Sequence, residues 1–147
     1  MDKTVSGCFE IKKPNRSEIN NIVYDFAATY DLSKEKIHIL ADKYAKCAEL
    51  VVAYYSQTIV GYIAYYRNDV NSGVAYITMV VVKEDYRKKG IASLMLKCVI
   101  DDCIQNGFSI IRLEVDNENK NAIALYKKFG FKFEKTASER SSYYRYT

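Results

Sequence analysis

A basic turn between two apolar segments is the part of the chain best suited to bind an anion. Residues 80–92 read Val-Val-Val-Lys-Glu-Asp-Tyr-Arg-Lys-Lys-Gly-Ile-Ala, which predicts a strand, a turn and the start of a helix. The first helical amides, those of Ile91, Ala92 and Ser93, have no intrahelical acceptors and lie at the positive end of the helix dipole. Because Gly90 has no side chain, a phosphate can approach the backbone closely there. The stretch therefore predicts a phosphate site.

Three cations, Arg87, Lys88 and Lys89, precede this glycine. Arg87 is the one that can bind phosphate oxygens in a bidentate manner. A basic turn of this kind is also compatible with an ordinary solvated surface. The sequence contains neither G-x-x-x-x-G-K-[ST] nor G-x-G-x-x-G, which excludes a nucleoside-triphosphate P-loop and a Rossmann dinucleotide site.

The pattern R-x-x-G-x-A at residues 87–92 resembles the pyrophosphate-binding signature of the GCN5-related N-acetyltransferases, the GNAT superfamily. A second pattern, N-x-x-A-x-x-L-Y-x-x-x-G-F at residues 119–131, is similar to the helix that flanks the other side of the coenzyme in that family. The two patterns follow the family's order and usual separation. Together they carry the resemblance over most of residues 76–133.

The resemblance implies the GNAT fold, an α/β fold with a mixed, mostly antiparallel central sheet of about seven strands. Its central parallel pair splays apart, and about four helices flank the sheet. We expect residues 1–147 to form one such domain. A chain of 147 residues can bury a core without disulfides or metals, and its one proline and six glycines form no linker-like segment.

The resemblance also implies an activity, the transfer of acetyl from acetyl-CoA to a primary amine by direct attack in a ternary complex. A small-molecule amine is the acceptor we expect. Two alternatives remain open. One is a protein N terminus, as in the ribosomal-protein alanine acetyltransferases, and the other is a family member that binds acyl-CoA without catalysis.

Two catalytic roles follow from the resemblance. Tyr126, a phenol with an ordinary pKa of about 10, is expected to give a proton to the coenzyme A sulfur; its alternative is a packed helix tyrosine. Glu114 lies twelve residues before Tyr126, a spacing similar to that of the base and acid in the ribosomal-protein alanine acetyltransferases. Glu114 is expected to take the acceptor's proton, and its alternative is an exposed carboxylate at a strand end.

Further coenzyme contacts are also implied by the resemblance. The backbone groups of Val80 and Val82 are expected to bind the pantetheine arm as an added strand does. A backbone amide near Val81 or Val82 is expected to stabilise the oxyanion. Asn119 and Ala122 are expected to flank the coenzyme, although Asn119 is also compatible with a purely local role at a helix start.

Hydrophobic periodicity and turn residues predict the elements that position these side chains. Because a helical crossover separates the fourth predicted strand from the fifth, these two are expected to be parallel. In the family the first two helices cover the acceptor site, and His38 in the second is either a packing residue or a substrate contact. The predicted strands are residues 8–12, 49–56, 58–67, 74–82, 108–115, 131–136 and 142–147; the predicted helices are residues 17–30, a segment starting at 33, 89–106 and 121–129.

Composition narrows the class of partner. The net charge is +4, with cations interspersed among acidic residues, which fits an anionic coenzyme better than nucleic acid. The fourteen tyrosines are explained by half-buried positions on strands as well as by a base-stacking surface. Four cysteines without C-x-x-C and a single histidine argue against a metal site. Cysteines that need not form disulfides are expected to be reduced thiols, which predicts a cytoplasmic location. With no membrane-length apolar run, we expect a monomer or homodimer that binds neither nucleic acid nor membrane.

Overall fold

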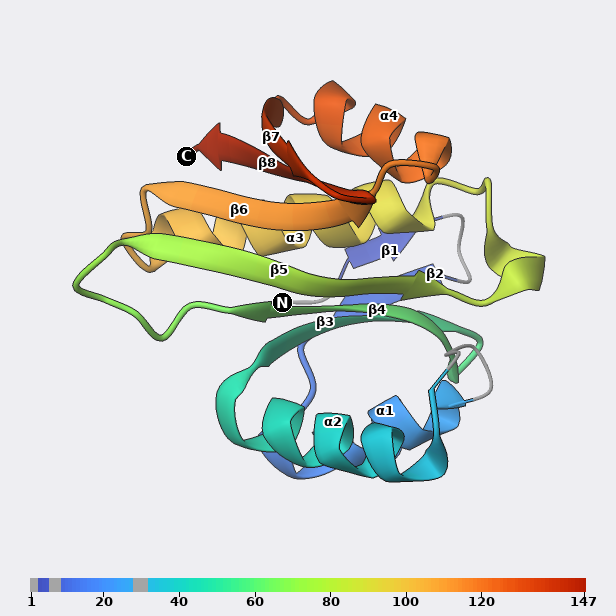
Figure 1. Ribbon diagram of the computed structural model, residues 1–147. Coiled ribbons are helices and arrows are strands. Elements are labelled where there is room, and N and C mark those ends of the chain that lie inside the picture. Colours follow the sequence, from blue (N-terminus) through green and yellow to red (C-terminus); the bar gives the residue numbers. More distant parts are fainter. Residues whose placement is uncertain (1–2, 6–8, 28–31) are drawn as a thin grey trace.

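The computed structural model, which describes residues 3–5, 9–27 and 32–147, is built on an eight-stranded sheet with helices on both faces (Figure 1). The strand order is β1-β2-β3-β4-β5-β6-β8-β7. The strands are β1 (Lys3–Val5), β2 (Phe9–Lys12), β3 (Glu49–Tyr55), β4 (Thr58–Tyr66), β5 (Val74–Val82), β6 (Ile110–Asp116), β7 (Lys132–Ala137) and β8 (Arg140–Tyr146). The helices are α1 (Ile19–Asp25), α2 (Lys34–Cys47), α3 (Ile91–Gln105) and α4 (Lys120–Lys128), with short 3-10 turns η1 (Arg16–Glu18) and η3 (Glu84–Tyr86).

The predicted mixed sheet with a central parallel pair is confirmed. β5 and β6 run parallel, and the other neighbouring strands in the described part of the chain pair antiparallel. The count is eight strands instead of about seven, because the short β1 adds an edge beside β2. A three-residue strand is too short to show periodicity, so it could not be predicted from the sequence.

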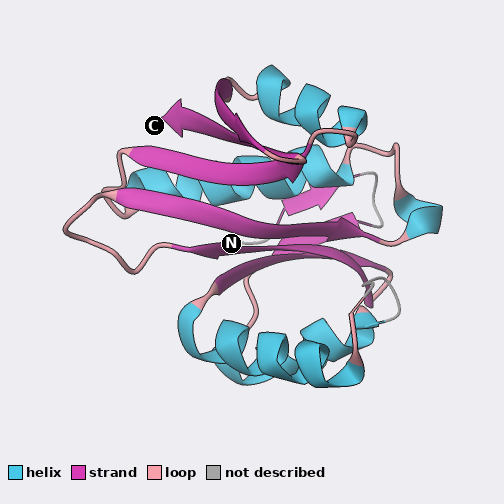
Figure 2. Cartoon of the chain, in the orientation of Figure 1, coloured by secondary structure: helices cyan, strands magenta, loops and turns pink. Residues whose placement is uncertain are grey.

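The two helical layers cover different parts of the sheet (Figure 2). Residues of α3 and α4 form one core with the inner face of β3 to β6 and β8. Residues of α1 and α2 form a second core on the other face, mainly against β3 and β4. Figure 1 accordingly shows α1 and α2 beside β3 and β4, whereas β6, β8 and β7 carry a helical layer on one face only.

The opening between the two parallel strands is set by where their pairing stops. Pairing runs from Val74 with Ile110 to Ile77 with Leu113 and goes no further. Beyond that point β5 continues to Val82 and β6 to Asp116. The predicted splayed pair is therefore confirmed. Because backbone groups in the second half of β5 have no partner strand on the β6 side, this opening can accept a strand-like ligand.

The predicted N-terminal elements are confirmed where the structure describes them. Ser33 caps α2, since its hydroxyl accepts a hydrogen bond from the Lys36 amide at 3.2 Å. The first helix begins as η1 and continues as α1 to Asp25. Two predicted boundaries, Cys8 for the first strand and Tyr30 for the first helix, lie outside the described residues.

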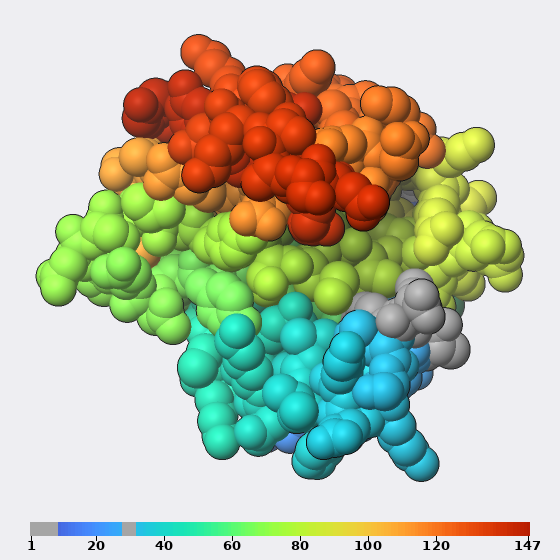
Figure 3. Space-filling model, in the orientation of Figure 1, coloured from blue at the N-terminus to red at the C-terminus, as the bar shows by residue number. Residues whose placement is uncertain are grey.

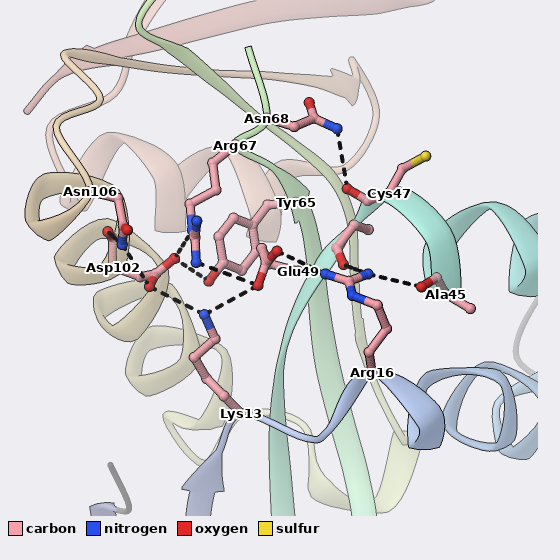
Figure 4. Close-up of polar contacts among 11 residues, drawn as sticks. Lys13, Arg16, Ala45, Cys47, Glu49, Tyr65, Arg67, Asn68, Asp102 and Asn106 are labelled. Carbon is pink, nitrogen blue, oxygen red and sulfur yellow. Dashed lines mark hydrogen bonds and ion pairs between the residues drawn. The ribbon is translucent and has the colours of Figure 1, made fainter. Parts of the chain in front are cut away.

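A polar cluster clamps the second half of α3 to the sheet (Figure 4). Asp102 accepts hydrogen bonds from the Tyr65 hydroxyl at 2.7 Å and from Arg67 Nε at 2.6 Å, and pairs with Lys13 Nζ at 3.2 Å. Burial alone raises the pKa of Asp102, but the bonds from Tyr65 and Arg67 and the charge of Lys13 outweigh it and hold the pKa below its usual value. The apolar periodicity that predicts this helix gives no indication of the cluster, because the partners of Asp102 come from other segments of the chain.

Two buried tyrosines of β4 are expected to respond oppositely to loss of their hydroxyls. Tyr62 and Tyr65 are both 0% exposed. The Tyr62 hydroxyl has no hydrogen-bond partner among the described residues, whereas the Tyr65 hydroxyl donates to Asp102. We expect Tyr65→Phe to lower the free energy of unfolding by about 1–3 kcal/mol, and Tyr62→Phe to change it little or raise it. Urea unfolding followed by circular dichroism measures both, and equal losses would contradict this account.

Candidate active site

The start of α3 lies in a hollow at the end of β5. The hollow has a volume of about 210 Å³. Most of the residues predicted to bind phosphate line this hollow, and Lys89 lies outside it. The lining residues are Val82, Tyr86, Arg87, Lys88, Gly90, Ile91, Ala92 and Ser93. The structure therefore brings the predicted turn and the first helical amides together around one concave surface.

Gly90 sets the geometry of this turn. Its φ of 80° is left-handed, and an added Cβ would meet no described atom within 4 Å beyond the two neighbouring residues. Its carbonyl accepts the first helical hydrogen bond, from the Leu94 amide at 3.2 Å. The amides of Ile91, Ala92 and Ser93 have no acceptor among the described residues. They are free to bind an anion, as the sequence predicted.

Arg87 is anchored to the end of β5. Its Nε donates a hydrogen bond to the carbonyl oxygen of Val82 at 3.0 Å. This contact uses one of the five N–H donors of the guanidinium and leaves both terminal nitrogens for a ligand. The predicted bidentate grip on a phosphate is therefore compatible with the position of the side chain.

The direction of the backbone groups of β5 follows from its pairing with β4. The Lys83 amide donates to the Val60 carbonyl at 2.8 Å, so Lys83 points toward β4. Because backbone groups alternate along a strand, Val81 also points toward β4, whereas Val80 and Val82 point toward the opening. Of the two amides proposed for the oxyanion, that of Val82 is the one on the correct side.

Tyr126 is buried on the helical side of β6. The side chain is 5% exposed, and its ring packs edge-on against Phe131 with centroids 5.9 Å apart. Burial raises the pKa of Tyr126 to about 12, while the nearby charge of Arg140 acts in the opposite direction. The phenol therefore stays protonated at neutral pH, as a proton donor must.

Glu114 lies on the opposite, uncovered face of the sheet and has a partner that the sequence did not indicate. Arg140 Nε is 3.5 Å from Glu114 Oε1, and Arg140 Nη2 donates to the Glu114 carbonyl at 3.1 Å. Both side chains are about half exposed, at 52% for Glu114 and 54% for Arg140. The charges of Glu114 and Arg140 also act on Tyr76, whose pKa is raised chiefly by burial and further by Glu114. Arg140 is therefore close to both predicted catalytic residues, which have no direct contact with each other in the described part of the chain.

Asn119 caps the start of α4, the local role that the sequence analysis gave as the alternative to a coenzyme contact. Its Oδ1 accepts a hydrogen bond from the Ala122 amide at 3.2 Å and caps α4. This bond fixes the start of the helix that carries Tyr126. The Nδ2 group has no partner among residues that the structure describes, so a coenzyme contact stays a prediction.

Within the described part of the chain, neither the Cys103 thiol nor a cluster of acidic residues forms a second reactive centre. Cys103 is buried, and burial together with the Asp102 charge raises the pKa of its thiol to about 12, which disfavours the nucleophilic thiolate. No three His, Cys, Asp or Glu side chains cluster as a metal site within residues 3–5, 9–27 and 32–147. Over the same residues no helix has the length and apolarity needed to span a bilayer.

A sequence model of the Acetyltransferase (GNAT) family matches residues 13–131, most of the chain. The chain belongs to the GNAT family. Among curated proteins, N-alpha-acetyltransferase MAK3 of Arabidopsis thaliana is 41% identical over 56 residues, which cover 38% of this chain and 30% of MAK3. The [ribosomal protein bS18]-alanine N-acetyltransferase of Escherichia coli K12 is 35% identical over 65 residues, covering 44% of this chain and 42% of that protein. The matches thus span less than half the length of these relatives.

Solved GNAT structures share the fold over nearly the whole chain. Naa50 of Arabidopsis thaliana, in complex with the bisubstrate analogue CoA-Ac-MVNAL, superposes with a TM-score of 0.77 at 24% identity and covers 94% of this chain and 98% of that one. PaiA N-acetyltransferase of Thermoplasma acidophilum, in complex with coenzyme A, has a TM-score of 0.71 at 18% identity, with 95% and 99% covered. At these identities the likeness establishes the fold, and the roles of individual side chains are argued below.

Proposed function

We propose that this GNAT protein is an acetyl-CoA-dependent N-acetyltransferase that acts on a primary amine in a ternary complex. The proposal depends on one observation, that an unpaired strand edge and a phosphate-sized hollow adjoin each other. The unpaired second half of β5 leads directly into the hollow at Gly90, where the first amides of α3 have no acceptor. A strand-like arm that ends in phosphates fits this arrangement. We further propose that residues 1–147 act as one domain in the cytoplasm.

The residues present fit coenzyme A part by part. Arg87, Lys88 and the amides of residues 90–93 would hold the diphosphate, and Lys89 would add charge at the rim. The inward backbone groups of Val80 and Val82 would bind the peptide-like arm. Asn119 and Ala122, at the start of α4, would flank it on the other side.

The proposed chemistry needs a proton acceptor for the amine and a proton donor for the departing thiolate. Glu114 would accept the proton directly or through a water molecule, and Tyr126 would donate one to the sulfur. Of the backbone amides that point into the opening, that of Val80 lies nearer to Glu114 than that of Val82, which lines the phosphate hollow. The Val80 amide would therefore stabilise negative charge on the carbonyl oxygen. The raised pKa of Cys103 supports direct attack by the amine over a covalent route through that thiol.

An acceptor screen monitored by release of free thiol from acetyl-CoA tests this function. The screen should include spermidine, amino sugars, amino acid amides and short peptides with free N termini. Thiol release that depends on one class of amine supports the proposal. Calorimetric binding of acetyl-CoA without release by any amine would instead favour the non-catalytic alternative.

Glu114→Gln is expected to slow turnover at neutral pH by less than about tenfold, because solvent can partly replace a proton acceptor at an exposed site. The loss should shrink at alkaline pH, where the free amine is already deprotonated. A pH profile of kcat measures this change. A variant equally slow at every pH would show that Glu114 is not the proton acceptor.

The relatives leave two acceptor classes to be considered. Thialysine N-epsilon-acetyltransferase of Bos taurus is 40% identical over 55 residues, in keeping with the small-molecule acceptor that the sequence led us to expect. The bS18-alanine enzyme is named for a protein substrate. The second class, a protein or peptide N terminus, is favoured by the surface described next.

A further inference from the structure

We propose that the uncovered face of β6, β8 and β7 binds the peptide chain that follows the acetylated N terminus of a peptide or protein acceptor. This inference rests on the proposed function and names its acceptor class. We call this surface the C-terminal face and define it by the side chains that the strand register and the two hollows place on one side: Ile110, Arg112, Glu114, Lys132, Glu134, Lys135, Ser142, Tyr144 and Tyr146. In the space-filling view of Figure 3 these strands, in orange and red, lie above the green surface of β5, and α1 and α2, in blue and cyan, lie below it.

The C-terminal face contains two adjoining hollows. One, of about 400 Å³, is lined by Arg112, Glu134, Tyr144 and Tyr146 among others. The other, of about 250 Å³, shares Arg112 and Glu134 with it and reaches Glu114. Together they follow β6 from Ile110 to Glu114, a distance of about 13 Å at the rise of a β-strand. An extended peptide of about four residues, with its amine at Glu114, has this length.

The carboxylates on this face already have cationic partners. Arg112 Nη2 is 3.2 Å from Glu134 Oε2, and Arg140 Nε is 3.5 Å from Glu114 Oε1. A polyamine needs carboxylates without cationic partners along its length, and each carboxylate here has a guanidinium beside it. The pairing therefore favours an acceptor that has one ammonium group followed by an uncharged chain.

Aromatic side chains supply the contact area for such a chain. The rings of Tyr144 and Tyr146 pack edge to face with centroids 5.5 Å apart, and Tyr146 is 66% exposed. Phe133, at the rim, is 55% exposed. Tyrosine and phenylalanine are enriched where proteins bind other chains, because they bury large areas at a small cost in side-chain entropy. A small amine at Glu114 would leave these rings unused.

The test compares acceptors of matched chemistry and different length. The probes are hexapeptides with a randomised first residue and an uncharged remainder, the corresponding amino acid amides, and spermidine, each assayed by thiol release. We expect kcat/KM at least about tenfold higher for the peptides than for the amides, since the face adds binding energy beyond the first residue. Equal values for peptides and amides, or a preference for spermidine, would overturn the proposal.

Tyr146→Ala tests whether the peptide preference comes from the C-terminal face. It should raise KM for the hexapeptides severalfold and leave KM for the amides unchanged. The matched control is Ile104→Ala, which removes an apolar side chain that is 48% exposed from α3, on the other side of the sheet. Loss of peptide preference in both variants, or in neither, would argue against the C-terminal face.

Amide chemical shifts separate this proposal from the proposed function. In protein saturated with coenzyme A, the hexapeptides should perturb amides of β6 and β8. Perturbation without acetyl transfer would refute the enzymatic function and leave the binding face standing. Acetyl transfer without perturbation would support the enzymatic function and refute the binding face. If sedimentation shows a dimer that Tyr146→Ala dissociates, a second copy of the chain covers the face and the proposal is wrong.

Discussion

Gly90→Leu is expected to abolish acetyl-CoA binding, with a loss of affinity of at least about a hundredfold, while the domain remains folded. The leucine side chain would project into the space where an anion must approach the amides of residues 91–93, so the effect is steric exclusion of the ligand. Apart from Gly90 and its two chain neighbours, no atom of the described residues lies within 4 Å of the added Cβ, so no internal clash is expected. The remaining cost is the left-handed backbone, about 1–2 kcal/mol.

Gly107→Leu is the matched control for this experiment. Gly107 has the same φ of 80° and likewise has nothing within 4 Å of an added Cβ, but it follows the opposite end of α3. Both variants should lose similar thermal stability, and only Gly90→Leu should lose coenzyme binding in calorimetric titration. Wild-type affinity in Gly90→Leu would refute the phosphate site. Loss of binding in both variants would show that the effect is on folding.

Tyr126→Phe is expected to lower kcat at least tenfold and leave the affinity for acetyl-CoA nearly unchanged. The substitution removes one hydroxyl and keeps the ring that packs against Phe131, so packing of α4 should be preserved. The pattern is that of a group that acts in the transition state and contributes little to ground-state binding. Steady-state kinetics of thiol release together with calorimetry separate the two quantities, and unchanged kcat would refute the acid role.

Tyr143→Phe provides the control, because Tyr143 is also 5% exposed and belongs to the same core cluster. Its loss of a hydroxyl should not slow the reaction. The pH profile supplies a second check. An acid works in its protonated form, and burial raises the pKa of Tyr126 to about 12. Turnover should therefore not decline on the alkaline side below about pH 11, and a decline near pH 10 that Tyr126→Phe abolishes would contradict the raised pKa.

The order and type of the elements could be predicted from the sequence because each depends on local signals. Alternating apolar residues mark the strands, and apolar residues at three- and four-residue steps mark the helices. Glycine marks the start of α3, where φ is positive at Gly90. The two family signatures, at residues 87–92 and 119–131, depend on short-range spacing in the same way. The ends of the elements were predicted less accurately: the helix predicted at residues 89–106 begins at Ile91 in the structure.

The contacts between distant segments could not be predicted in this way. Nothing near Glu114 in the chain indicates Arg140, which reaches it because β8 pairs with β6. Asp102 likewise gains its partners only when α3 packs on β4. Asn119 and Ala122 were predicted to contact the coenzyme. In the structure the Ala122 amide donates to Asn119 Oδ1, a bond that forms because both residues lie at the start of α4.

By itself the sequence determined the family, the phosphate-binding turn and the residue types available for acetyl transfer, because all of these are written in short stretches of chain. The tertiary structure decided which faces of the sheet are covered, which carboxylates already have cationic partners and which amides point into the opening. Those features depend on strand register and on long-range packing, which join residues far apart in the chain and leave no periodic signal within either segment.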